Sequence, residues 1–92
     1  MNKFEMLSDL LDTLKFVTEE ELRLESVGIT IESIGKVETV VFDCIKNVIG
    51  MPKKEEEGIF ISDIWFDMVF DYAQGKQDKK HVITELINWN KE

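Results

Sequence analysis

The chain has 92 residues and carries 19 acidic against 11 basic side chains, which gives a formal net charge of −8. This length suits one domain, and a hydrophobic share of 43% is typical of a folded protein rather than a disordered one. The negative charge opposes the phosphate contacts that supply most of the affinity for nucleic acid, and it equally disfavours anionic membranes. We therefore expect no direct binding to nucleic acid and no membrane binding.

Apolar residues at helical spacing predict a first helix from about Lys3 to Val17. Phe16 falls on the polar face of this helix, which is unusual for an aromatic side chain. Thr18 and Glu21 have the spacing of a capping box, so we expect a second, short helix over Glu19–Glu25.

Residues 27–31 alternate between apolar and small or polar side chains, as a strand does, and Gly28 and Gly35 argue against a continuous helix there. The next stretch, Lys36 to Ile49, has a strong helical period, and Gly50 with Pro52 predicts its end. Its apolar residues form one expected inward stripe, made of Val37, Val41, Cys44, Ile45 and Val48.

Glu38 projects onto the apolar side of this helix, which allows two interpretations. It is either a buried acid with a raised pKa or a residue of the first helical turn, where a carboxylate interacts favourably with the helix dipole. A helix that begins near Gly35 favours the second interpretation.

The clearest break in the chain is the predicted loop over residues 50–61, in which residues 59–61 are either a short strand or an anchor for the loop. Ser62 is the expected N-cap of a helix over Asp63–Gln74, which Gly75 ends. Asp78 then caps a last helix from Lys79 to about Asn90, and the short link predicts that the last two helices are antiparallel.

These elements define an all-α protein, a small bundle of four main helices plus a short one, in a single domain over residues 1–92 with the loop 50–61 between its halves. The alternative is an α+β fold in which residues 27–31 pair with residues 59–61 as two short strands. The expected core contains residues from the apolar faces of the predicted helices: Leu11, Val41, Ile45, Met68, Val69, Leu86 and Trp89.

The most specific polar feature is a row on the predicted helix 63–74, where Asp63, Asp67, Asp71 and Gln74 crowd into an arc of about 80°. The rest of that helix is apolar, which predicts a central position or a covering second subunit. The row is either a solvated stripe, a face for a basic protein partner or, least favoured, a metal site. We take Asp63, Asp67, Asp71 and Gln74 as the candidate partner-binding residues.

No arrangement in the sequence predicts catalysis, a cofactor or a metal site. His81 is the single histidine and Cys44 the single cysteine, and one of each does not make a familiar zinc site. The five glycines form no phosphate-binding loop, and the common catalytic motifs are absent. We therefore expect a protein that is not an enzyme.

A cytoplasmic location is expected from two features. The longest apolar run has three residues, far fewer than the roughly 20 that span a bilayer, and Met1–Glu5 does not read as the start of a signal peptide. Cys44 cannot form an intrachain disulfide, and its apolar sequence surroundings predict a buried, unreactive thiol.

The segment Val82–Trp89, which follows the acidic and aromatic segment Ser62–Asp67, resembles the last half of small acidic helical immunity proteins of the nuclease-colicin type. The resemblance covers about a third of the chain and assigns a role to no residue. It implies a helical protein that inhibits a nuclease.

Charge and helical pattern together favour a small soluble acidic interaction protein, a binder or inhibitor of a basic partner such as a nucleic-acid enzyme, of the immunity or phage anti-defence type. Carboxylates complement a phosphate-binding surface and speed association through long-range attraction. The alternative is a structural homo-oligomer, such as a homodimer, or an accessory subunit of a larger assembly with no catalytic activity.

Overall fold

The computed structural model describes the backbone of residues 2–50 and 55–89 and the side chains of residues 2–50 and 64–88. These residues form four helices and no strand: α1 (Lys3–Ser26), α2 (Glu32–Ile49), α3 (Glu55–Ala73) and α4 (Lys79–Trp89). The predicted all-α bundle is confirmed. The α+β alternative is wrong, because residues 27–31 connect α1 to α2 and residues 59–61 lie within α3.

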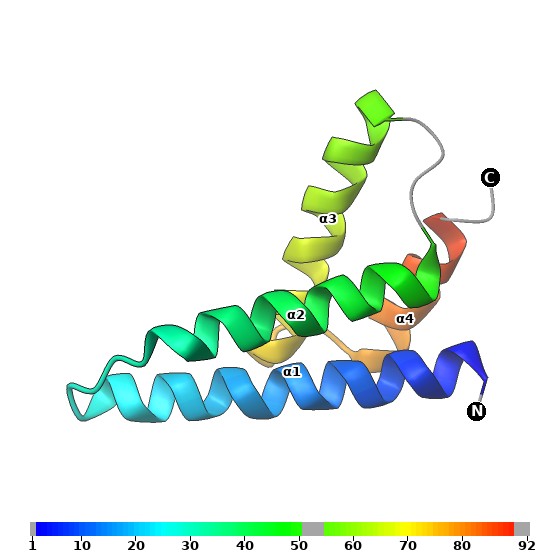
Figure 1. The fold of residues 1–92 in the computed structure, drawn as a ribbon. Coiled ribbons are helices and arrows are strands. Elements are labelled where there is room, and N and C mark those ends of the chain that lie inside the picture. The colour runs from blue at the N-terminus through cyan, green and yellow to red at the C-terminus, as the bar shows by residue number, and fades with distance from the viewer. Residues whose placement is uncertain (1, 51–54, 90–92) are drawn as a thin grey trace.

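Helices α1 and α2 form a long hairpin, and α3 and α4 pack behind it as a second layer (Figure 1). α3 runs toward the hairpin and α4 runs back in the opposite direction, as the short link between them predicted. The end of the hairpin near residue 30 extends past the second layer, so the molecule is elongated, with extents of 45 × 27 × 22 Å.

Helix α1 is one continuous helix of 24 residues, so the predicted pair of helices, Lys3–Val17 and Glu19–Glu25, is wrong. Thr18 does not cap a helix; its buried hydroxyl donates a hydrogen bond to Glu38 Oε2 at 2.9 Å, across the interface with α2. The contact with α2 thus outweighs the local capping signal. Asn2 caps α1 instead, since its side-chain oxygen accepts from the Glu5 N–H at 2.8 Å.

Gly28 ends α1 with a positive φ of 82°, a conformation that glycine adopts without steric cost. The Gly28 N–H donates to the Glu25 carbonyl, and the Ile29 N–H donates to the Leu24 carbonyl. These two bonds make a Schellman motif, which satisfies carbonyls at the helix end. Gly28 therefore interrupts the helical path, as predicted, but it does so by terminating α1 rather than within a strand.

Two helices begin earlier than predicted. α2 starts at Glu32 instead of Lys36, with Gly35 inside it. α3 starts at Glu55 instead of Asp63, so Ser62 is not an N-cap, and residues 55–61 are helical where a loop was predicted. Residues 51–54, which include Pro52, lie outside the described residues. Two predicted ends are confirmed, Gly50 after α2 and Gly75 after α3.

Helix α4 begins where predicted. The Asp78 carboxylate accepts a hydrogen bond from the His81 N–H at 3.3 Å, which confirms the predicted N-cap. The helix is described to Trp89, one residue short of the predicted end, and residue 90 lies outside the described residues.

One hydrophobic core joins all four helices. Of the predicted core residues, five are buried: Leu11, Val41, Ile45, Val69 and Leu86. Met68 is only partly buried, and the side chain of Trp89 lies outside the described residues. The largest fully buried side chain is Trp65, which the predicted core omitted. Its indole N–H has no hydrogen-bond partner in the described part of the chain, so this tryptophan contributes through packing alone.

Replacing Leu86 by alanine removes a fully buried side chain where α4 meets the core. We expect Leu86→Ala to lower the free energy of unfolding by about 2–4 kcal/mol, measured by urea denaturation. Leu22→Ala is the control, because Leu22 is half exposed and its loss is expected to cost about 0.5 kcal/mol or less. Equal losses in the two variants would contradict the packing of α4 against the hairpin.

Candidate functional site

The predicted acidic row lies on α3 and faces solvent in part. Asp67 is exposed, Asp71 one turn later is partly buried, and Gln74, just past the helix end, is exposed. The Asp63 side chain lies outside the described residues. Neither Asp67 nor Asp71 forms an ion pair with any side chain that the structure describes. Their carboxylates are therefore free to meet a cation from another molecule.

A polar cluster ties α1 to the second layer. Tyr72 Oη donates a hydrogen bond to Asp12 Oδ1 at 3.0 Å, and Lys79 Nζ donates to Asp12 Oδ2 at 3.0 Å and to Ser8 Oγ at 3.2 Å. The hydrogen bond from Lys79 lowers the pKa of Asp12, and burial raises the pKa of Tyr72. Because each of these groups is used to join helices, we assign the cluster a structural role.

A second polar cluster lies between α1 and α2. Glu38 is only 8% exposed, so its side chain is buried, and the first-turn interpretation is wrong. The physical reason is that α2 begins at Glu32, which places Glu38 inside the helix and against Thr18 of α1. Burial and the nearby negative charge of Glu38 raise the pKa of Glu21. Glu21 and Glu38 thus lie close together in a partly buried region between the two hairpin helices.

The α1–α2 hairpin carries an open groove of about 340 Å³. Its lining comes from both helices: Met6, Asp9, Leu10, Cys44 and Val48. On α1, Ser8 and Asp12 point toward the second layer, where they bond to Lys79. A helical projection at about 100° per residue places Met6 and Leu10 on the opposite side of α1. Figure 1 shows α3 and α4 on one side of the hairpin, so this projection places the groove on the side turned away from them.

The apolar surface continues along α2 beyond the groove. Val37 and Val40 are 45% and 60% exposed, and Cys44 is exposed as well. The predicted inward stripe is therefore wrong for Val37 and Cys44, although its members Val41 and Ile45 are buried. The apolar residues of α2 cover a wider arc than α1 and the second layer enclose. A helical projection of the sequence shows how wide this apolar arc is, and it could have indicated that part of α2 stays uncovered.

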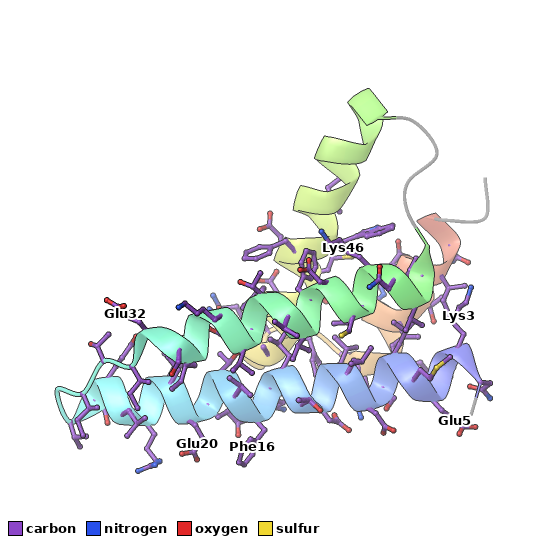
Figure 2. The ribbon with its side chains drawn as sticks, in the orientation of Figure 1. Lys3, Glu5, Phe16, Glu20, Glu32 and Lys46 are labelled. Carbon is purple, nitrogen blue, oxygen red and sulfur yellow. The ribbon has the colours of Figure 1, made fainter. Side chains whose placement is uncertain are left out.

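Charged residues flank the hairpin on both edges. Figure 2 shows Glu5, Phe16 and Glu20 projecting from the edge of α1 that faces away from α2, and Lys46 from the outer edge of α2. Lys46 pairs with Asp43 at 3.3 Å, and Arg23 pairs with Glu20 at 2.7 Å. Phe16 is 66% exposed, which confirms its unusual position on the polar face of α1.

The described residues contain no group of three His, Cys, Asp or Glu side chains arranged to hold a metal ion. Within the same residues, no helix combines the length and apolar character needed to cross a bilayer. Comparison of the chain with protein-family models, with curated proteins and with solved structures finds no match in any of the three. The groove on the hairpin and the acidic row on α3 are therefore the two candidate sites.

The exposed position of Cys44 reverses the expectation of an unreactive thiol. We expect the native protein to react with one equivalent of a maleimide without denaturant, because the sulfur lies on an open surface. Mass spectrometry measures the extent of labelling, and Cys44→Ala is the unlabelled control. Labelling that starts only in denaturant would contradict the exposed orientation of this side chain.

The raised pKa of Glu21 predicts how stability changes with pH. The folded state holds the Glu21 proton more tightly than the unfolded chain, so this group's contribution to stability falls as the pH rises through the raised value. Glu21→Gln removes the charge, so we expect this variant to be about 0.5 kcal/mol more stable than the wild type at neutral pH.

Urea unfolding across the acid range tests this expectation. The two proteins should converge in stability as the pH falls below 4.5, the ordinary value for this group. A Glu20→Gln variant is the control, because Glu20 is bonded to Arg23 and its loss should not stabilise the fold. A constant difference between Glu21→Gln and the wild type at every pH would contradict the close approach of the two acids.

Proposed function

We propose that this chain is a small acidic interaction protein that binds and inhibits a basic protein partner, such as a nucleic-acid enzyme. The observation that carries the proposal is the pair Asp67 and Asp71, which lie one turn apart on α3 without a cationic partner in the described part of the chain. The net charge of −8 adds a long-range attraction for a positively charged surface.

The spacing of these carboxylates has an energetic consequence. Like charges one turn apart destabilise an isolated helix by a few tenths of a kcal/mol, and a partner's lysine or arginine between them removes that repulsion. Attraction of this kind raises the association rate more than it slows dissociation. The proposal places the protein in the cytoplasm, where a free exposed thiol such as Cys44 stays reduced.

A structural homo-oligomer is the second candidate function, and one observation favours it. Val37 and Val40 are exposed apolar side chains on the face that no helix of the described chain covers. Stable self-association that is insensitive to salt, measured by analytical ultracentrifugation, would support this candidate. Like-charge repulsion between two chains of −8 opposes it.

The test of the acidic row begins with the partner, captured on the immobilised protein from the organism that encodes it. The triple variant Asp63→Asn, Asp67→Asn and Asp71→Asn then removes the charges of the row. We expect folding to be nearly unchanged, and the association rate at low salt to fall by about tenfold in stopped-flow or surface-plasmon measurements.

The matched control is Glu55→Gln, Glu56→Gln and Glu57→Gln, which changes the net charge equally in the first turn of the same helix. A clearly larger loss for the aspartate triple supports a specific face on α3. Equal losses would mean that bulk charge alone drives association, and no loss in either variant would contradict the proposed role of the row.

A further inference from the structure

We propose that the open face of the α1–α2 hairpin receives an amphipathic helix of the partner, with an apolar stripe flanked by Lys or Arg. The open face is defined by six residues: Met6, Leu10, Val37, Val40, Cys44 and Val48. This inference rests on the proposed function, and it names the part of the partner that would carry the contact.

The shape of the open face fits a helix. Two helices that lie side by side form a groove between them, and a third helix can pack into such a groove through interdigitating side chains. The open groove is of this kind, because it lies between Met6 and Leu10 of α1 on one side and Cys44 and Val48 of α2 on the other. Asp9 is the charged side chain of its lining, so most of the surface offered is apolar.

The length of the open face sets the length of the partner segment. Val37 and Val48 are eleven residues apart on α2, which corresponds to about 16 Å along the helix axis. A partner helix of about three turns spans that distance, with apolar side chains spaced three or four residues apart. Val40, at 60% exposure, offers the largest unburied apolar contact on α2.

The negative charge of the hairpin favours a basic partner segment at the open face. Residues 3–49, which include the whole hairpin, carry ten acidic and five basic side chains. Asp9 lines the groove itself, and its carboxylate forms no ion pair with any side chain that the structure describes. A second copy of this chain would bring the same excess of negative charge to the open face, whereas a Lys or Arg beside an apolar stripe could pair with the Asp9 carboxylate.

The test uses the full chain and a displayed library of helical peptides of about 14 residues, with a fixed apolar stripe and all flanking positions randomised. We expect selected peptides to be enriched in Lys and Arg at the flanks. Because Cys44 is the single cysteine, its alkylation rate reports occupancy of the groove. A saturating selected peptide should slow this rate by about tenfold.

Two matched variants locate the contact. Val40→Glu places a charge on the open face, and we expect it to weaken peptide affinity by about tenfold, equivalent to about 1.4 kcal/mol. Ile64→Glu makes the same change at an exposed apolar position of α3 and should leave affinity unchanged. Both positions are exposed in the wild type, so circular dichroism should show intact helices in each variant.

Three results would overturn the inference. Peptides that bind without slowing the alkylation of Cys44 would place the contact elsewhere, while leaving the acidic interaction function intact. Selected peptides without basic flanks would contradict the charge argument. Alkylation that slows as the protein's own concentration rises, with no peptide present, would identify a second copy as the occupant. Loss of the proposed function is recognised separately, by the absence of any effect of the aspartate triple on the captured partner.

Discussion

The packing of α1 against α2 is the contact on which the rest of the molecule depends. Leu7, Leu11 and Leu14 recur on one side of α1 and share a buried cluster with Ile45 and other residues of α2. The Schellman motif at Gly28 reverses the chain, so the two helices can pair over most of their length. The second layer covers one side of this hairpin (Figure 1), and the groove lined by Met6 and Val48 stays open on the hairpin.

The hairpin contains two polar clusters, which shift carboxylate pKa values in opposite directions. Beside the second layer, Lys79 stabilises the charged form of Asp12, so this contribution is present above the ordinary pKa of 3.8 and is lost as the pH falls. Between the hairpin helices, burial and the neighbouring Glu38 raise the pKa of Glu21, which gives a contribution to stability of the opposite sign. The hydrogen bond from Thr18 offsets part of the cost of burying Glu38 and fixes how α1 faces α2.

The sequence predicted what depends on local chemistry and missed what depends on tertiary contact. Gly50, Gly75 and Asp78 mark helix boundaries because glycine and aspartate act through their own backbone or a nearby amide, and these predictions are confirmed. Thr18 carries a capping signal that its contact with Glu38 overrides. The acidic row was found from spacing alone, since Asp67 and Asp71 share one helix. The wide apolar arc of α2 indicates an uncovered surface, but the groove itself joins Met6 to Val48 across the hairpin and therefore depends on the tertiary packing.

Both proposed binding surfaces, the acidic row of α3 and the open face of the hairpin, belong to a fold in which a continuous α1 packs along α2. Spin labels at Lys3→Cys and Ser26→Cys, in a Cys44→Ala background, test this most directly, because these residues begin and end α1. Electron paramagnetic resonance should give one narrow distance distribution, centred near the value of about 35 Å that separates the two backbone positions in an unbroken helix. A shorter, broad distribution, as expected for two helices that meet near Thr18, would contradict a continuous α1.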